Sequence, residues 1–222
     1  MSTFIANDDG LKIELILGDC QIESLKVPEN SVQLILTDPP YGIDYSGRGR
    51  PKEIIRDRLV NDADEMNLQF LLSRPELKIV WGAQNFLRQL PNLGRWLCWD
   101  KRLTEKADKM LGSAFELAWC SRESGYYKMY RVLHGGSYNA DAFGVRRVHP
   151  TQKPAKLMRK IIEDFTKPGD TVFDPFMGSG TTGIASRQMG RSFIGIEIAP
   201  NYFEIACRKI KETQPILFST EE

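Results

Sequence analysis

Short runs of apolar residues alternate along the chain with segments whose apolar residues recur at helical spacing. This alternation is typical of βαβ units, in which helices join the strands of a mostly parallel sheet. Helices are predicted over 83–90 and from Pro154 onward, where a proline in the first turn sacrifices no hydrogen bond. A length of 222 residues suits one α/β domain over 1–222. The predicted strands are 13–17, 32–36, 77–81, 96–99, 115–120, 171–173 and 193–196.

Two long segments, 44–62 and 121–148, interrupt this pattern and are predicted to be loops that contact DNA. Connectors of this length in a compact domain are usually functional or disordered. Between 121 and 160, nine Lys or Arg residues are opposed by two acidic residues, and aromatic residues are interleaved with them. Such a mixture suits a phosphate backbone with bases nearby. Charge alone favours the alternative of a solvated loop with some buried tyrosines, and the net charge of +1 indicates no particular partner.

Several classes of protein are disfavoured by composition. No apolar stretch approaches the ~20 residues of a membrane span, and the first eleven residues do not form a signal peptide. A cytoplasmic, DNA-associated protein without a membrane partner is therefore expected. The four cysteines are widely spaced and include no CxxC pair, so neither disulfides nor a metal site is expected. They are Cys20, Cys98, Cys120 and Cys207.

The first chemically informative motif is Asp38-Pro39-Pro40-Tyr41, which directly follows a predicted strand. The carboxyl end of a strand is where ligands bind in an open α/β sheet. Two prolines make the backbone rigid and remove two donors, which leaves carbonyls, a carboxylate and a ring. These groups suit an aromatic amine: oxygen acceptors hold its hydrogens, and Tyr41 stacks on its ring. The alternative is an ordinary boundary between a strand and a turn.

The second motif runs from Val172 to Thr182 and consists of a strand, a glycine-rich turn and a helix. Glycines allow close approach of the backbone to a ligand, and the start of a helix offers free N–H groups. Glu197 ends the next strand, close to where an acidic residue binds ribose hydroxyls in dinucleotide folds. A P-loop is excluded because no Lys-Ser or Lys-Thr pair follows the glycines.

The third motif is His149-Pro150-Thr151-Gln152-Lys153-Pro154, a polar turn that leads into a predicted helix. Lys153 could meet an anionic carboxylate, but an ordinary helix start explains the same residues equally well. His149 is interpreted as a hydrogen-bonding residue rather than a base.

Together these motifs resemble the beta group of DNA amino-methyltransferases, whose order is catalytic motif, target-recognition region and cofactor motif. The segments that carry the resemblance are 38–42, 149–154, 174–182 and 195–197, with further support from 17–20 and 80–86. The resemblance implies a seven-stranded, mostly parallel, Rossmann-like methyltransferase sheet with loop insertions for target recognition. It also implies a circular permutation that moves the usual first strand, 171–173, near the C-terminus.

The resemblance further implies S-adenosyl-L-methionine as cofactor and assigns roles to individual residues. The flipped target base would be held by the catalytic residues Asp38, Pro39, Pro40 and Tyr41. Glu197 would bind the ribose hydroxyls, and Lys153 would lie near the methionine carboxylate. DNA contacts are assigned to Arg48, Arg50, Arg146 and Arg147. The complete cofactor set is Asp19, Cys20, Asp38, Lys153, Asp174, Phe176, Gly178, Ser179, Gly180, Thr181 and Glu197.

The expected activity is methylation of adenine N6 in a specific sequence of double-stranded DNA by base flipping. Cytosine N4 methylation is the nearest alternative, although enzymes of that type more often carry Ser at the position of Asp38. A methyltransferase of RNA or protein glutamine and an inactive DNA-binding relative are more distant alternatives. A cytosine C5 mechanism is disfavoured because no Pro-Cys pair supplies a thiolate. Homodimerisation and a role in restriction-modification are expectations that come from the family.

Overall fold

The computed structural model describes residues 3–8, 10–41, 66–102, 113–123, 127–133 and 153–216. Its helices are α1 (Cys20–Glu23), α3 (Gln69–Leu72), α4 (Ala155–Phe165), α5 (Thr181–Gln188) and α6 (Pro200–Glu212), with 3₁₀ turns η1 (Ser24–Lys26) and η2 (Ala83–Phe86). Its strands are β1 (Thr3–Asp8), β2 (Leu11–Leu17), β3 (Leu34–Thr37), β4 (Leu77–Trp81), β5 (Arg95–Asp100), β6 (Phe115–Cys120), β7 (Lys128–Arg131), β8 (Thr171–Asp174) and β9 (Ser192–Glu197).

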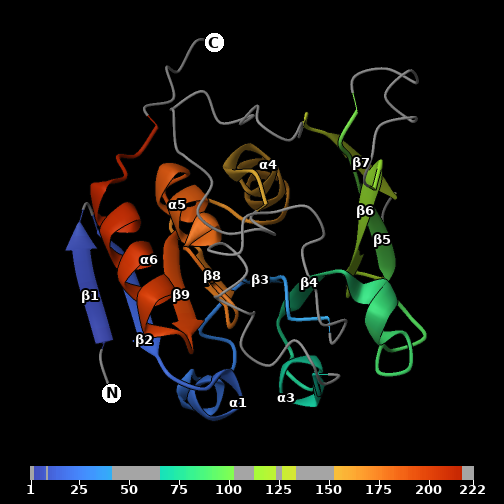
Figure 1. Cartoon of the computed structure of the whole chain (residues 1–222), viewed down its shortest axis with the longest axis horizontal. Coiled ribbons are helices and arrows are strands. Elements are labelled where there is room, and N and C mark those ends of the chain that lie inside the picture. Colours follow the sequence, from blue (N-terminus) through green and yellow to red (C-terminus); the bar gives the residue numbers. More distant parts are fainter. Residues whose placement is uncertain are drawn as a thin grey trace, which may run out of the picture.

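These strands form one mixed, mostly parallel sheet in the order β1-β2-β9-β8-β3-β4-β6-β5-β7 (Figure 1). Within the described ranges, β1 and β6 are the strands that pair antiparallel to their neighbours. The expectation of seven strands is therefore wrong in number, because β1 and β7 extend the two edges to nine. Near the centre, β8 lies between β9 and β3 although it follows β3 by more than a hundred residues. The circular permutation itself stays a prediction.

Helices and turns cover both faces of the sheet and make a three-layer arrangement. Alternate residues of each strand point to opposite faces, so Leu34 and Leu36 join one apolar cluster while Ile35 joins the other. The first cluster includes buried side chains of α4, α5 and α6, which lie together in Figure 1. The second cluster includes Leu71 of α3 and Phe86 of η2. Burial on both faces explains why the central strands are almost continuously apolar.

Most of the predicted elements are confirmed within one or two residues, and two are not. Lys128–Arg131 lies in a segment predicted as loop but forms β7, which pairs with residues 97–100 of β5. In this short edge strand only Tyr130 is buried, so its sequence has no apolar run to mark it. The helix predicted over 83–90 is shorter in the structure, where Ala83–Phe86 forms a single 3₁₀ turn.

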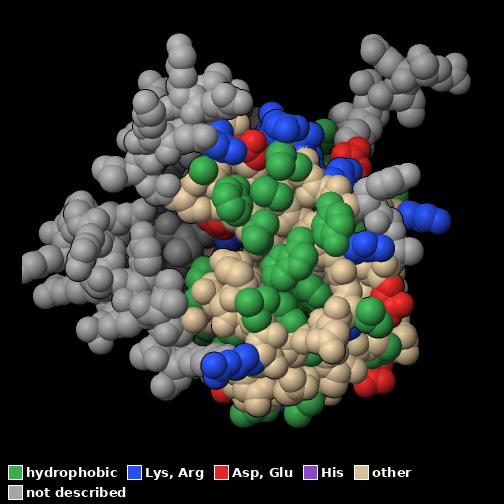
Figure 2. All heavy atoms as spheres, turned by 90° about the vertical axis from the view of Figure 1, so that its right-hand side faces the viewer, with side chains coloured by type: hydrophobic (Ala, Val, Ile, Leu, Met, Phe, Trp, Pro, Cys, Tyr) green, Lys and Arg blue, Asp and Glu red, His purple; other side chains and the backbone are tan. Residues whose placement is uncertain are grey.

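The β7 edge also exposes apolar side chains, among them Tyr127 and Met129. Figure 2 shows apolar side chains gathered on the side of the molecule that carries this end of the sheet. Unpaired strand edges are usually protected in native proteins. Homodimerisation nevertheless stays a prediction, because no partner chain is present. Within the described ranges, no helix is long and apolar enough to cross a membrane.

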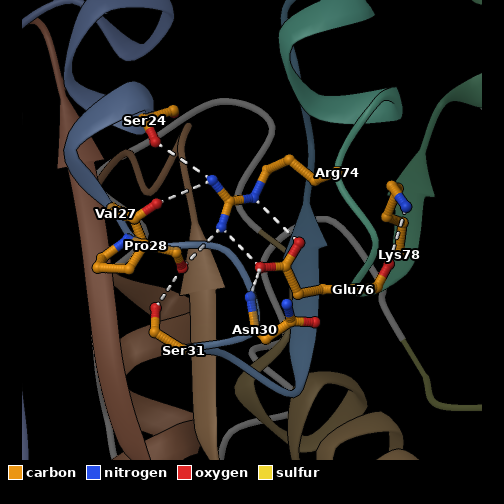
Figure 3. Close-up of polar contacts among 8 residues, drawn as sticks. All are labelled: Ser24, Val27, Pro28, Asn30, Ser31, Arg74, Glu76 and Lys78. Carbon is orange, nitrogen blue, oxygen red and sulfur yellow. Dashed lines mark hydrogen bonds and ion pairs between the residues drawn. The ribbon is translucent and has the colours of Figure 1, made fainter.

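A buried arginine fastens the segment after α1 to the start of β4 (Figure 3). Arg74 donates from Nη2 to Glu76 Oε1 at 2.7 Å and from Nε to Oε2 at 3.1 Å. Its guanidinium also donates to the carbonyls of Ser24, Val27 and Pro28. Burial alone would raise the pKa of Glu76, but hydrogen bonds, led by those from Arg74, lower it.

We predict that Arg74→Met destabilises the fold by about 3 kcal/mol, because it leaves the buried Glu76 carboxylate without its cation. Urea unfolding would measure the loss. The double variant Arg74→Met/Glu76→Gln should recover part of it, since the buried side chain at position 76 is then no longer charged. A loss below about 1 kcal/mol for the single variant would mean that water replaces the guanidinium.

Candidate active site

The candidate site is built where two motifs distant in the sequence meet at adjacent strand ends. β3 and β8 pair in parallel, with Leu34 opposite Val172, so Thr37 and Asp174 reach the same edge of the sheet. The Thr37 hydroxyl donates to Asp174 Oδ1 at 2.7 Å. Asp38 follows Thr37 directly, so the catalytic motif adjoins the glycine-rich motif as predicted for an open α/β sheet.

The Asp38 carboxylate is held by two side chains. Lys153 Nζ contacts Asp38 Oδ2 at 2.5 Å, and the Tyr41 hydroxyl donates to Oδ1. Asp38 keeps 23% of its side-chain surface exposed, whereas Lys153 keeps 6%. Burial alone would lower the pKa of Lys153, but Asp38, Tyr41 and Glu116 raise it. Lys153 is therefore a buried ammonium whose charge is compensated by carboxylates.

Tyr41 lies against β4 and η2. A Cβ atom at Gly82 would come within 2.0 Å of the Tyr41 ring, and Gly82 has a left-handed φ of 64°. The Tyr41 and Phe86 rings meet edge to face, with their centroids 6.4 Å apart. Burial, and then the charge of Asp38, raises the pKa of Tyr41, so its hydroxyl stays a donor. Pro39 is buried and Pro40 is half-buried.

Glu116 is part of this site although no sequence motif indicated it. Its Oε2 lies 3.1 Å from Lys153 Nζ, and its Oε1 contacts Lys101. β6 runs antiparallel to β4 and β5, so its first residues lie among the last residues of those strands. Site residues were expected directly after parallel strands. Glu116 was missed because it lies at the beginning of β6, which is antiparallel to its neighbours.

Asp174 is a buried carboxylate that the described residues do not pair with a cation. It accepts hydrogen bonds from Thr37, from Thr182 Oγ1 at 2.7 Å and from the Phe176 N–H at 3.1 Å. Burial raises its pKa to about 6 despite these hydrogen bonds, and the charge of Asp38 adds to the rise. Asp174 is 3% exposed.

The turn after β8 is shaped by its glycines. Gly178 and Gly180 adopt left-handed φ angles of 53° and 86°, and Gly180 is the N-cap of α5. A Cβ atom at Gly178 would meet no neighbour within 4 Å, so this backbone borders open space. Ser179 and Thr181 are buried beside it. The Phe176 ring packs edge to face against Phe70, at 6.3 Å between centroids.

The neighbouring strand ends bring Glu197, Asp19 and Cys20 to the same edge. Leu17 of β2 pairs with Glu197 of β9, and the Gly18 N–H donates to the Glu197 carbonyl at 2.9 Å. Burial raises the pKa of the Glu197 carboxyl, whose Oε1 accepts the Ala199 N–H at 2.7 Å. Asp19 caps α1 by accepting the Gln21 N–H, which gives it a structural role. Burial raises the pKa of the Cys20 thiol to about 12.

The predicted DNA-contacting residues Arg48, Arg50, Arg146 and Arg147 lie outside the described residues, as do His149 and the loop 44–62. Of the loop 121–148, the ranges 121–123 and 127–133 are described. In the part of the chain that the structure describes, no group of three His, Cys, Asp or Glu side chains could hold a metal ion.

Comparison with known proteins supplies the family. A model of the N6/N4 class, described as DNA methylase, matches residues 99–208. The chain is 32% identical over 213 residues to the methylase-family protein YubD of Escherichia coli (strain K12), with 90% of each chain covered. The chain belongs to the N6/N4 DNA methylase family. It is also 28% identical over 250 residues to the type II methyltransferase M.HinfI of Haemophilus influenzae, covering 90% of this chain and 69% of that one.

Solved structures of DNA methylases share this fold. The complex of M1.HpyAVI with SAM superposes with a TM-score of 0.56 at 25% identity, covering 88% of this chain and 98% of that one. The cytosine-N4-specific PvuII DNA methyltransferase superposes with a TM-score of 0.58 at 18% identity, covering 90% of each. The family predicted from the three motifs is thus confirmed, while the fold alone does not distinguish adenine from cytosine.

We predict that ionised Asp174 destabilises the folded chain. Because its pKa rises from 3.8 to about 6 on folding, the folded state retains the proton more strongly, and the free energy of unfolding falls as pH rises from about 4 to about 6. The change corresponds to about 3 kcal/mol. Asp174→Asn should therefore gain stability over the parent across this window and hold that gain at higher pH. Urea unfolding from pH 4 to pH 8 measures the difference, and a difference independent of pH would contradict the prediction.

Proposed function

We propose that the chain methylates N6 of adenine in double-stranded DNA, with S-adenosyl-L-methionine as methyl donor. The observation that carries this proposal is the Asp38 carboxylate at the end of β3, oriented by Lys153 and Tyr41 and joined through Thr37 to the glycine-rich motif. An acceptor for an amine and a site for a methyl donor would then lie side by side.

The residues at the ends of β8, β9 and β2 fit S-adenosyl-L-methionine. Asp174 is a buried anion without a cation in the described ranges, which suits the ammonium group of an amino acid. The Glu197 carboxylate suits the ribose hydroxyls, because a charged acceptor strengthens such hydrogen bonds. The open backbone at Gly178 suits the methionine portion. The SAM-bound structure of M1.HpyAVI supports this choice of cofactor.

When bound, the cofactor supplies an electrophilic methyl group on a sulfonium sulfur. The chain's own residues prepare the nucleophile. Asp38 and the backbone carbonyls of Pro39 and Pro40 would accept the amine hydrogens and direct the nitrogen lone pair away from the ring. The nitrogen forms a bond to the methyl carbon, the carbon–sulfur bond breaks, and S-adenosylhomocysteine is released. Asp38 would then accept the proton that the nitrogen loses, and its exposed surface lets that proton pass to water.

The base must leave the duplex stack to reach Asp38, and flipping it costs a few kcal/mol. Stacking on Tyr41 offsets part of this cost. Contacts with the DNA backbone are assigned to Arg48, Arg50, Arg146 and Arg147, as the sequence predicts. The DNA sequence that the protein recognises would depend on the two segments, 44–62 and 121–148, that carry these arginines.

The predicted product is N6-methyladenine. Purified protein would be incubated with unmethylated plasmid DNA and labelled S-adenosyl-L-methionine, and the digested nucleosides would be identified by mass spectrometry. N4-methylcytosine as the main product would preserve the amine chemistry and overturn the choice of base. No methylated base at all would overturn the proposed function.

Two variants should distinguish loss of methyl transfer from loss of cofactor binding. Asp38→Ala should abolish methyl transfer while DNA affinity stays within about twofold of the parent. Glu197→Ala should weaken cofactor binding roughly tenfold to a hundredfold, because a hydrogen bond to a charged group contributes ~1.5–3 kcal/mol. Calorimetry measures affinity, and labelled-methyl transfer measures turnover. Substantial turnover by Asp38→Ala, or unchanged affinity in Glu197→Ala, would remove that residue from its assigned role.

A further inference from the structure

Four charged side chains alternate in sign from the catalytic motif to the β5–β6 end of the site. Asp38 contacts Lys153, Lys153 also contacts Glu116, and Glu116 contacts Lys101. The two lysines lie over aromatic rings: Lys153 Nζ is 5.5 Å from the Trp81 centroid, and Lys101 Nζ is 4.9 Å from the Trp99 centroid. The two tryptophans meet edge to face at 6.3 Å. The row contains two cations and two carboxylates, so it is neutral when all four are charged.

The two carboxylates that share Lys153 are not equivalent. Asp38 Oδ2 accepts a hydrogen bond from Lys153 Nζ at 2.5 Å. Glu116 Oε2 lies 3.1 Å from the same nitrogen, yet this buried oxygen has no well-aligned hydrogen-bond donor among the described residues. Of the two contacts that the ammonium makes, the one with Glu116 is therefore the longer and the less well aligned. Burial alone would raise the pKa of Glu116, but Lys153 and Lys101 lower it, which keeps the group ionised.

Asp38 faces a conflict in the proposed reaction. To hold the amino group of a base, its carboxylate needs free lone pairs and a high electron density. In the structure, one oxygen accepts from Tyr41 and the other from Lys153, whose full charge would weaken Asp38 as an acceptor. A second anion that draws Lys153 away would relieve this conflict, and Glu116 Oε2 is already within reach of the ammonium.

We propose that Glu116 is a positioning residue that shares Lys153 with Asp38 and takes over its ammonium when Asp38 binds the target amine. Glu116 acts through Lys153 and does not touch the base. This inference rests on the proposed function, because it presumes that Asp38 accepts an amine. A purely structural Glu116 would instead only join β5 to β6 through Lys101.

Glu116→Gln tests the proposal, because it retains the shape of the side chain and removes its charge. We expect kcat for DNA methylation to fall about tenfold, with the KM for S-adenosyl-L-methionine unchanged. The acid limb of the kcat–pH profile should move to lower pH, because a negative charge beside Lys153 and Asp38 is lost. Glu116→Asp, which keeps the charge, should retain the parental acid limb.

The matched control is Asp100→Asn, which removes a carboxylate at the end of neighbouring β5. Asp100 pairs with Arg102 and Arg131, so its loss should leave both kcat and the acid limb at parental values. A parental kcat and acid limb in Glu116→Gln would overturn the proposal. So would a loss of kcat without a shift of the acid limb, because a structural role predicts that result.

A second measurement separates this inference from the proposed function. Carbon NMR of the Asp38 carboxyl, with Asp38→Asn for assignment, measures its pKa without turnover. A lower Asp38 pKa in Glu116→Gln than in the parent supports the coupling, and an identical pKa overturns it. If the parent methylates no DNA, the proposed function fails, and the NMR result still decides whether Glu116 acts on Asp38 through Lys153.

Discussion

The hydrogen bond from Thr37 to Asp174 connects the two halves of the candidate site. The two residues are 137 positions apart in the chain, and parallel pairing of β3 with β8 brings them together. Thr37 is buried and ends its strand, so Asp38 starts from a fixed point beside the glycine-rich turn. The placement of Asp38 next to the glycine-rich turn therefore follows from sheet topology.

Asp38 and Asp174 lie at the same edge of the sheet, but their surroundings differ in how they compensate a negative charge. Asp38 is partly exposed, and Lys153 compensates its charge. Asp174 is fully buried and is stabilised by neutral hydrogen bonds alone within the described ranges, so its pKa rises to about 6. An uncompensated anion destabilises the empty fold and gives back that energy when a cation binds beside it. The same buried charge at Asp174 would thus lower the stability of the fold and raise its affinity for the ammonium group of a ligand.

The sequence predicted the parallel sheet and the strand ends well, because strands such as Leu77–Trp81 are apolar on both faces. It also predicted the three motifs and, through them, the family. It did not predict β7, whose Lys-Met-Tyr-Arg sequence is exposed except at Tyr130 and depends on pairing with β5. Nor did it predict that Lys153 pairs with Asp38 and Glu116, and the expected place of Lys153 near a cofactor carboxylate stays a prediction. A motif shows that a charge is present, but its partner depends on tertiary structure.

Glu116 shows why such partners are difficult to find from sequence. Binding residues are usually sought where parallel strands end, since those ends share one edge of the sheet. An antiparallel strand inserted between parallel ones reverses that rule, because its beginning lies at the shared edge. Phe115 of β6 pairs with Asp100, and Glu116 pairs with Trp99, at the end of β5. In a mixed sheet, the residues that open each antiparallel strand therefore belong in the search for a site together with the residues that follow each parallel strand.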